Sequence, residues 1–575
     1  MADNYDDYTR DQLLRLLRER DRKPKFGLVW ERDEIEHDNA VNEDFVALDF
    51  IPELSCHAEL PALSPDELGR NNPPPPTFHN LIIEGDNFDA LRFLRMTHAG
   101  KVKCIYIDPP YNTGNRDFIY NDRFIDKDDV YKHSKWLEFM YRRLLVAKEL
   151  LAEDGVIFVS IDDNEVFNLG GLMNKVFGEN NFIATCIWQK RYSSSNDHKT
   201  IAPMHEYVLV YQASNVWKRN LLPRGESKDN LYRYKDEKGI FRPDNYTCNK
   251  SATERPNLYY PIIQPKTGEE IWPKKTRVWS FSKEEHLRHK EEGLIYWGKD
   301  GLGKVPAFKR YKHLLKNIDG VVPTTWWTFE EVGHTDTAKK ELLDILSEHA
   351  TAFSTPKPVR LIERILRIAT KSDDLVLDFF AGSGTTAHAV MKLNAEDGGN
   401  RRFILVSNTE ATGDAPDKNL CRDVCAERVR RVMRGYTNKK GEAVEGLGGN
   451  PSTTLRTGFA YLRTRRIPAE AVLSRIEHEQ VWIALQLIHT ETLQTYATNS
   501  VMQTVVLPDD GMLAYCTKVN EDILSQLLDL AGGNGIVVVY SWQPGWLRQY
   551  LPNESITVEQ IPAFLINRFG GDYAA

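Results

Sequence analysis

A short stretch that ends at residue 114 combines a buried strand with groups that could activate an amine. The stretch CIYIDPPYNTG, Cys104–Gly114, is apolar until Asp108, which two prolines and Tyr111 follow. An amino group on an aromatic ring is a weak nucleophile because its lone pair is delocalised into the ring. Hydrogen bonds from its N–H groups to a carboxylate and a carbonyl would draw that lone pair towards tetrahedral geometry. Asp108 can supply the carboxylate and Pro109 the carbonyl, so the turn indicates chemistry on an amine.

The other residues of this turn fit the same chemistry. Pro109 and Pro110 fix the backbone and remove N–H donors that would otherwise compete. The Tyr111 ring can stack on a base that has been taken out of a nucleic-acid duplex. A Pro-Pro turn could also do no more than end a strand, but a second motif further along the chain favours the chemical interpretation.

That second motif is LVLDFFAGSGTTAHAV, residues 375–390, which predicts a strand, a glycine-rich turn and a helix. Gly382 and Gly384 would let the backbone approach a ligand, and the helix N-terminus offers free N–H groups. A phosphate-binding loop would need a lysine after its second glycine, and a dinucleotide fingerprint would need a third glycine. What remains is DxFxGxGxT, the pattern with which methyltransferases hold S-adenosylmethionine (SAM). A plain strand-to-helix turn is the alternative.

The elements that must position both motifs alternate between strand and helix. Five β-branched runs predict buried parallel strands, at 79–86, 102–108, 155–162, 374–380 and 402–407. Residues 133–154 predict a helix between two of them, and 181–190 and 205–212 predict a further strand pair. Both motifs follow parallel strands at the carboxyl edge, where open α/β sheets bind ligands, so they would face one crevice.

Composition limits the class of protein. With 575 residues, of which 41% are hydrophobic and 27% charged, the chain is too long for one core and too apolar for disorder. The seven cysteines form no CxxC pair, which favours a reducing compartment; Cys421 and Cys425 are expected to pack in the core. The sequence shows no apolar signal segment and no uncharged stretch of membrane-spanning length, so a cytoplasmic protein with no membrane partner is expected.

The net charge of −8 argues against a general nucleic-acid coat, but the charge is unevenly distributed. Residues 186–320 contain 26 Lys and Arg against 16 Asp and Glu, which leaves about +10 there and about −18 in the rest. Aromatic residues are interleaved with these charges, as in WPKKTRVWSF and KRYKHLLK. Such a mixture can contact phosphates and stack on bases, or it can simply form a solvated face.

Taken together, the motifs resemble those of the β-class amino-methyltransferases of DNA, and specifically the modification (Mod) subunits of type III restriction-modification systems. The resemblance rests on LIIEGDNFDAL, IYIDPPYNTG, FSTPKP and LVLDFFAGSGTTAH in this order, within about 81–408. In that class the catalytic turn precedes the SAM loop, and a target-recognition insert lies between them, where this chain has its basic segment. DGLGKVPAFKRY and VVPTTWW, in and just after that segment, also resemble Mod subunits.

The resemblance implies a set of site residues. The catalytic turn would be Asp108, Pro109, Pro110 and Tyr111, and the cofactor-binding residues Asp86, Lys357, Asp378, Phe380, Gly382, Gly384, Thr385 and Glu410. Asp378 would either touch SAM or hold the loop. Many relatives place an acid on the ribose hydroxyls where this chain has Ser407 and Asn408, so Glu410 would take over that role.

A cluster of acids at Asp162, Asp163 and Glu165 could suggest a metal site. Three acids at the carboxyl end of a strand more often cap the next helix and border a polar cleft. We therefore expect no metal.

The resemblance also implies an architecture. This is an α/β, Rossmann-like SAM-dependent methyltransferase fold in the circularly permuted β-class order, with an inserted target-recognition domain and a small C-terminal α/β domain. The expected parts are an N-terminal arm with a proline-rich linker (1–76), a catalytic part (77–185), a target-recognition insert that includes a strand pair of the sheet (186–345), a SAM-binding part (346–440) and the C-terminal domain (455–575). A Gly/Ser-rich break at 439–454 precedes the last domain.

The implied activity is site-specific transfer of a methyl group from SAM to the N6 amino group of a flipped-out adenine in double-stranded DNA. No Walker A lysine and no helicase or nuclease signature occurs, so cleavage would need a separate restriction (helicase–nuclease) subunit. The alternatives are an N4-cytosine DNA methyltransferase, an orphan or phage-defence enzyme, an enzyme acting on RNA or on a protein glutamine, and a subunit that mainly recognises a site and recruits a nuclease. The recognition sequence stays open.

A homodimer is also expected, because Mod subunits work as dimers. The predicted long helix at 468–496 carries an apolar stripe formed by Val472, Ile476, Val481, Leu485 and Ile488. Such a stripe is more often intramolecular core, so the helix alone does not predict an interface. If the domain is a separate dimerisation module, truncation after Asn450 should leave the SAM pocket intact.

Overall fold

The chain divides into two compact units, Leu221–Pro323 and the remainder, Met1–Asn220 with Thr324–Ala575. The computed structural model describes residues 9–10, 28–32, 35–57, 77–114, 118–120, 123–193, 200–224, 230–315, 320–347, 355–411, 416–448, 458–532, 535–551 and 555–570. None of the helices in these ranges is long and apolar enough to cross a membrane.

A ten-stranded sheet forms the centre of the larger unit, in the order β1-β23-β3-β20-β19-β4-β7-β9-β8-β18. Its strands are β1 Phe45–Phe50, β3 Asn80–Glu84, β4 Val102–Ile107, β7 Leu151–Ile161, β8 Phe182–Gln189, β9 His205–Gln212, β18 Trp326–Trp327, β19 Leu375–Asp378, β20 Arg402–Ser407 and β23 Phe459–Ile467. Neighbouring strands from β23 to β7 are parallel, whereas β1 pairs antiparallel at one end and β9 and β8 at the other. The predicted parallel strands are therefore the centre of the sheet, where apolar runs can be buried on both faces.

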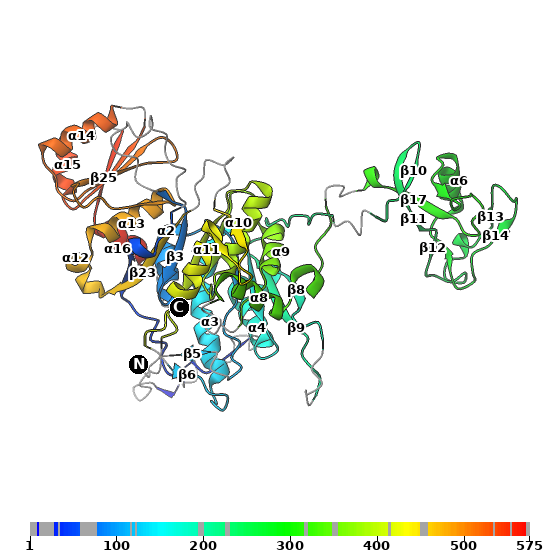
Figure 1. Ribbon diagram of the computed structural model, residues 1–575, viewed down its shortest axis with the longest axis horizontal. Helices are drawn as coiled ribbons and strands as arrows, with labels where there is room; N and C mark the ends of the chain where they lie inside the picture. Colours follow the sequence, from blue (N-terminus) through cyan, green and yellow to red (C-terminus); the bar gives the residue numbers. More distant parts are fainter. Residues whose placement is uncertain are drawn as a thin grey trace. The chain divides into compact units, whose positions relative to one another are not determined.

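Helices cover both faces of this sheet (Figure 1). One layer contains α13 His478–His489, α2 Asn87–His98, α3 Lys132–Leu150 and α4 Val166–Phe177; the other contains α9 Val359–Ala369, α10 Thr385–Asp397, α11 Glu427–Arg434 and α8 Thr335–Ile345. Right-handed crossovers from β19 to β20 and from β4 to β7 run in opposite directions across the sheet, so their helices lie on opposite faces. The strand order therefore reverses between β19 and β4, which is where open α/β sheets bind ligands. The expected α/β fold class is confirmed.

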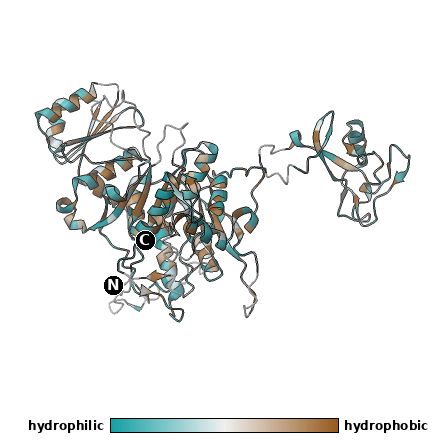
Figure 2. Cartoon of the chain, in the orientation of Figure 1, coloured by the Kyte–Doolittle hydropathy of each residue, from teal (hydrophilic) through white to brown (hydrophobic). Residues whose placement is uncertain are grey.

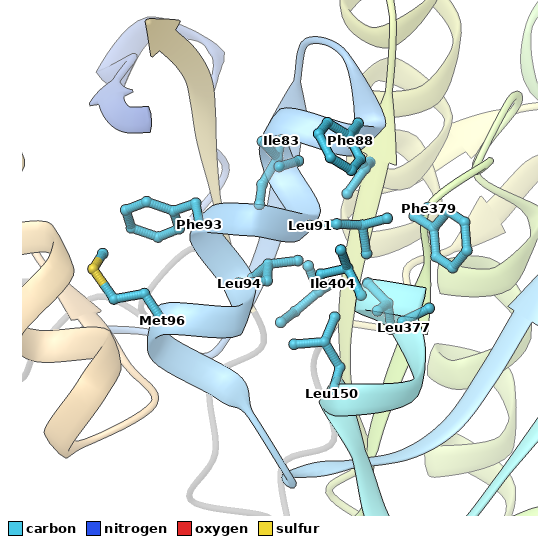
Figure 3. Close-up of a cluster of buried hydrophobic side chains, with 14 of the residues drawn as sticks. Ile83, Phe88, Leu91, Phe93, Leu94, Met96, Leu150, Leu377, Phe379 and Ile404 are labelled. Carbon is cyan, nitrogen blue, oxygen red and sulfur yellow. The ribbon is translucent and has the colours of Figure 1, made fainter. Parts of the chain in front are cut away.

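Helix α2 is packed into the apolar core of the larger unit. Figure 3 shows its side chains Phe88, Leu91 and Leu94 among Ile83 of β3, Leu150 of α3, Leu377 of β19 and Ile404 of β20. Figure 2 shows apolar residues concentrated along the strands of the central sheet. Each such side chain, when fully buried, contributes roughly 1.5–3 kcal/mol, so this core holds the strands that carry the two motifs.

Segments from the two ends of the chain complete the sheet. β23 lies between β1 and β3, parallel to β3 and antiparallel to β1. Residues 1–76 were expected to be an arm, yet Phe45–Phe50 is a strand of the sheet because β23 offers it an edge to pair with. The proline-rich run at 71–76 lies outside the described residues.

The predicted long helix at 468–496 is wrong in length. It consists of α12, Val472–Arg475, and α13, with a break at residues 476–477. Its apolar stripe belongs to the intramolecular core: Val472, Val481 and Leu485 are buried there, and Ile476 and Ile488 pack against it. The stripe therefore gives no support to dimerisation. The Gly/Ser-rich break lies partly outside the described residues, which resume at 458.

A second, four-stranded sheet follows in the order β25-β26-β27-β28. It consists of β25 Met502–Val506, β26 Met512–Cys516, β27 Val537–Ser541 and β28 Ile556–Gln560, with helices α14 Glu521–Ala531, α15 Pro544–Tyr550 and α16 Ala563–Phe569. Leu513 and Tyr515 of β26 extend the main core, where β26 packs against α13, and α13 packs against β1 of the central sheet. The remaining paired strands are β2 Thr77–Phe78 with β24 Leu493–Gln494, β5 Ile119–Tyr120 with β6 Arg123–Phe124 and β21 Gly435–Thr437 with β22 Ala443–Glu445, and a short helix, α7, spans Phe329–Val332.

The smaller unit has its own sheet, in the order β10-β11-β17-β16. It contains β10 Tyr234–Asp236, β11 Gly239–Asn245, β12 Thr247–Cys248, β13 Ile262–Ile263, β14 Glu270–Ile271, β15 Val278–Trp279, α6 Lys283–Glu291, β16 Ile295–Tyr296 and β17 Ala307–Tyr311. Tyr246, Tyr260, Ile262 and Trp279 form its buried core. This unit, Leu221–Pro323, is shorter than the expected insert 186–345, which was expected to include a strand pair of the sheet. The strands β8 and β9 of the central sheet lie where that pair was predicted.

We predict that Leu485→Ala lowers the free energy of unfolding by about 2–5 kcal/mol, because this fully buried side chain of α13 would leave a cavity. Leu473→Ala is the matched control, since Leu473 is 68% exposed on α12 and should change stability little. Urea denaturation followed by tryptophan fluorescence measures both. If Leu485→Ala instead left stability unchanged and altered the molecular mass in light scattering, α13 would be an interface helix.

Candidate active site

The turn that follows β4 meets a lysine from a distant segment. The Nζ atom of Lys357, which immediately precedes Pro358 and α9, lies 2.7 Å from both carboxylate oxygens of Asp108. The Tyr111 hydroxyl lies 2.8 Å from Oδ1 of Asp108 and 2.8 Å from Nζ of Lys357. The structure thus brings together two predicted catalytic residues and one predicted cofactor residue, and it places Lys357 on the acid of the catalytic turn.

Two further charged residues reach this cluster, and neither was predicted from the sequence. Glu206 of β9 accepts at Oε2 from the Tyr111 hydroxyl, at 3.0 Å, and at Oε1 from Nζ of Lys190, at 3.1 Å. Its Oε2 atom also lies 3.5 Å from Nζ of Lys357. The only local signal was an acid in the otherwise apolar strand HEYVLVYQ, in which Glu206 is 8% exposed.

The charges in this cluster balance. Burial raises the pKa of Asp108 above its ordinary value, and the nearby Glu206 charge adds to this effect while Lys357 opposes it. Burial alone would lower the pKa of Lys357, but Asp108 and Glu206 outweigh it and raise that pKa. Burial alone would raise the pKa of Glu206, but Lys357 and Lys190 outweigh it and lower that pKa. Two ammonium groups therefore neutralise two carboxylates.

Bonds on either side hold the backbone of the turn. The indole N–H of Trp136 donates to the Pro110 carbonyl at 2.7 Å. Asn112 adopts a left-handed conformation with φ of 58°, and its side-chain amide donates to Glu165 at 2.5 Å. Among the described residues, no hydrogen bond reaches the Pro109 carbonyl oxygen, so it can accept one from a substrate.

The acids at 162–165 have separate partners. Glu165 is 1% exposed and also pairs with Nδ1 of His133 at 2.6 Å, whereas Asp162 accepts from the backbone N–H of Asn164 at 2.9 Å. No group of three potential metal ligands occurs among the described residues. The Glu165 side chain thus accepts a hydrogen bond from Asn112, next to the Asp108–Tyr111 turn. It does not cap α4.

The glycine-rich turn follows β19 at the same edge of the sheet. Oδ1 of Asp378 accepts from the backbone N–H of Phe380 at 3.0 Å, and Oδ2 accepts from the Thr386 hydroxyl at 2.5 Å, so Asp378 holds the loop. Gly382 and Gly384 have positive φ values of 49° and 72°. A Cβ atom on Gly384 would lie 3.1 Å from the carbonyl oxygen of residue 425, so the close packing and the positive φ together favour glycine at this position.

Arg428 of α11 is a further residue of the site that was not predicted from the sequence. Its Nη1 donates to Oγ1 of Thr385 at 2.8 Å and to Oγ of Ser383 at 3.1 Å, and the residue is 0% exposed. Burial lowers the pKa of Arg428 to about 10. A buried arginine has no local sequence signature, because the loop that it braces lies 43 residues earlier in the chain.

The remaining predicted cofactor residues lie on neighbouring segments. Asp86 follows β3, accepts from the N–H of Phe88 at 2.7 Å to cap α2, and pairs with Arg143 at 3.2 Å. Glu410 follows β20 and pairs with Lys418 at 2.7 Å. Phe380 packs beside Phe139, with ring centroids 6.0 Å apart. A cofactor role for these residues stays a prediction.

We predict a pH-dependent stability difference between the protein and its Asp378→Asn variant. Burial raises the pKa of Asp378 from 3.8 to about 7, so between these values the folded state holds a proton that the unfolded state has lost. This bound proton contributes at most about 4 kcal/mol to the free energy of unfolding. The contribution is fully present below about pH 4 and is lost as the pH rises to about 7. An amide side chain at this position mimics the protonated acid, so the variant should gain relative stability over this range.

Denaturation midpoints of both proteins, measured from about pH 5 to pH 8, test this linkage. The Asp373→Asn variant is the control, because Asp373 is exposed in the segment just before β19. Parallel pH profiles for the protein and Asp378→Asn would contradict the assigned ionisation.

The fold and the site together place an Asp-Pro-Pro-Tyr turn and a glycine loop at the switch point of an open α/β sheet. The N6_N4_Mtase family, described as DNA methylase, matches residues 102–411, which is more than half of the chain. The chain belongs to this family of DNA methylases.

Individual relatives cover most of the chain. It is 34% identical to the type III restriction-modification enzyme StyLTI Mod subunit of Salmonella typhimurium over 73% of this chain and 65% of that protein. It is 36% identical to the type II methyltransferase M.KpnI of Klebsiella pneumoniae over 60% of this chain and 84% of that protein. The solved PvuII DNA methyltransferase, described as cytosine-N4-specific, aligns over 64% of this chain and 96% of its own at 13% identity, with a TM-score of 0.33.

Proposed function

We propose that this protein transfers a methyl group from SAM to the N6 amino group of an adenine in double-stranded DNA, as the modification subunit of a type III restriction-modification system. The observation that carries the proposal is the convergence of the Asp108 turn and the Asp378 loop at one edge of the sheet. Membership of the DNA methylase family and similarity to proteins named as type III Mod subunits support it. The choice of adenine rests on that similarity.

The residues around the glycine loop suit SAM. Left-handed glycines at 382 and 384 would let SAM approach the backbone N–H groups of the loop, and α10 begins at Thr385. Phe380 offers an apolar ring, and Asp86 a carboxylate that is 36% exposed at the neighbouring strand end. When bound, SAM supplies the methyl group on a positively charged sulfonium.

The catalytic turn suits an amine on a flipped base. Asp108 and the Pro109 carbonyl would accept its two N–H groups and so direct the lone pair away from the ring. Tyr111, whose hydroxyl accepts from Lys357 and donates to either Asp108 or Glu206, would present its ring to the base. These interactions orient the amine and do not bind the cofactor.

The smaller unit suits the role of target recognition. Residues 221–323 contain 21 Lys and Arg against 14 Asp and Glu, inside a chain with net charge −8. Lys274 and Lys275 are exposed, and so is Trp272 beside them, at 49%. Positive charge with accessible aromatic rings is typical of surfaces that contact phosphates and bases.

The similarity to proteins named as type III Mod subunits also suggests protein partners. A separate restriction subunit would supply cleavage, because the relatives are named as Mod subunits of restriction-modification enzymes. The homodimer also stays part of this proposal, and the stripe on α12 and α13 does not contribute to it because that stripe belongs to the intramolecular core. The chain spans 65% of the length of the StyLTI subunit.

We expect that Asp108→Ala abolishes methyl transfer and keeps the affinity for SAM within a few-fold, because Asp108 contacts the amine side of the crevice. Expression in a methylation-free host, followed by sequencing of native DNA with modification detection, reports both the base and the site. Isothermal calorimetry measures SAM binding, and Asp373→Ala is the control on an exposed acid.

Three results distinguish the possible activities. If N6-methyladenine is found with the unsubstituted protein and disappears in the variant, the proposal is supported. If N4-methylcytosine is found instead, the target base is cytosine and not adenine. DNA that carries neither modification after expression of the unsubstituted, SAM-binding protein would reject DNA methylation altogether.

A further prediction concerns the smaller unit. Replacing Lys274 and Lys275 by glutamine should weaken DNA binding and reduce the slope of log affinity against log salt by up to about 2. The reason is that the DNA keeps about one counterion at each phosphate that the protein no longer contacts. Fluorescence anisotropy at several salt concentrations measures the slope. Lys371→Gln with Lys518→Gln is a matched pair of exposed lysines in the larger unit and should leave the slope unchanged. An unaltered slope in the first variant would place DNA binding elsewhere.

A further inference from the structure

The Asp108 carboxylate is already engaged by two neighbouring side chains, Lys357 and Tyr111. Lys357 has three N–H donors, and they reach Oδ1 of Asp108, Oδ2 of Asp108 and the oxygen of Tyr111. Tyr111 has a single hydroxyl proton but two carboxylates within reach, Asp108 at 2.8 Å and Glu206 at 3.0 Å. Only one of these two bonds can form at a time.

This arrangement has a consequence for any amine that approaches Asp108. Both oxygens of the Asp108 carboxylate already accept from Lys357, so an incoming N–H competes with the ammonium for the same carboxylate. An ammonium without a partner in a buried site is costly. Lys357 is 8% exposed, and the only other carboxylate that it contacts among the described residues is Glu206, at 3.5 Å.

We propose that Glu206 is a positioning residue, which holds the Lys357 ammonium and the Tyr111 hydroxyl while the target amine takes their place on Asp108. This inference rests on the proposed function, because it concerns the same amine and the same acid. Nothing covalent changes at Glu206; one hydrogen bond of Lys357 moves from Asp108 to Glu206, and the Tyr111 proton turns to Glu206.

The antiparallel strand pair sets Glu206 in place for this role. Glu206 lies opposite Trp188 in the β8–β9 register, and Lys190, just beyond the end of β8, donates to Oε1 of Glu206 at 3.1 Å. Oε2 is thereby left for Tyr111 and Lys357. The Nζ atom of Lys357 also lies 5.8 Å from the Trp188 ring centroid, so a cation at this position has a second favourable neighbour.

A purely structural ion pair is the competing explanation, and pH dependence distinguishes the two. The Glu206 charge raises the pKa of Asp108 and the pKa of Lys357, so Glu206→Gln should lower both. The acid limb of the kcat/KM profile should then move to lower pH. Other titratable groups that face this cluster are Tyr106, Asp162 and Asp378. The Glu206 charge also raises the pKa of Tyr106 and of Asp162, so Glu206→Gln should lower these two as well.

Removal of Lys190 should act in the opposite direction. Lys190 lowers the pKa of Glu206, so Lys190→Gln should let Glu206 take up a proton at higher pH. A protonated Glu206 cannot hold the ammonium of Lys357, and the acid limb should therefore move to higher pH. If Glu206 only stabilised the fold, Glu206→Gln and Lys190→Gln would not shift the acid limb of the kcat/KM profile in opposite directions.

The experiment compares the full-length protein with Glu206→Gln, Glu206→Asp and Lys190→Gln, and uses Glu179→Gln as a control on an exposed acid that precedes β8. Calorimetry with SAM alone should show unchanged affinity in all of them. Methyl transfer to duplex DNA should show kcat reduced about 10- to 100-fold in Glu206→Gln, with partial recovery in Glu206→Asp, which keeps the charge.

Independent readouts keep the outcomes separate. NMR of isotope-labelled lysine side chains should show a lower pKa for Lys357 in Glu206→Gln, whether or not DNA is methylated. Unmethylated DNA with the unsubstituted protein would reject the proposed function. Normal kcat, pH profile and Lys357 titration in a folded Glu206→Gln variant would overturn the role of Glu206. If Glu206→Gln does not fold, an unmoved acid limb in Lys190→Gln would overturn that role equally.

Discussion

Parallel pairing of β4 with β19 is the interaction on which the site depends. Val376 and Leu377 of β19 pair with Cys104 and Ile105 of β4, so both strands end at one edge of the sheet. The crossovers that leave these strands run in opposite directions and place their helices on opposite faces. Such a reversal leaves a crevice between the strand ends. An acid at residue 108 and a glycine loop near residue 382 can therefore serve one reaction.

Charge balance constrains the residues that surround this crevice. A buried carboxylate is tolerated when an ammonium or several donors neutralise it, and two carboxylates close together need two such partners. Asp108 and Glu206 meet this requirement through Lys357 and Lys190. The β8–β9 pair, which extends the parallel sheet with antiparallel strands, thus contributes the second half of the ion-pair network, beyond its contribution to the sheet.

The glycine loop depends on its surroundings in a similar way. Asp378 closes it from within, by bonds to Phe380 and Thr386, and Arg428 braces its far side from α11. Glycine is favoured at position 384 because its φ is positive and the segment that leads into α11 passes close to it. The local pattern of this loop therefore reflects contacts within the chain as well as space for a ligand.

Apolar runs and turns that contain Gly or Pro are formed by residues close together in the sequence. The sequence alone therefore determined the five parallel strands, the two turns that follow β4 and β19, and the α/β class. Only the tertiary structure decided the pairing of β1 with β23, the break at residues 476–477 and the roles of Glu206, Lys190 and Arg428. Tyr111 and Glu206 are 95 residues apart, and Asp108 and Lys357 are 249 apart. Partners at such separations are chosen by strand register and by the need to neutralise buried charge, and neither leaves a local signature in the sequence.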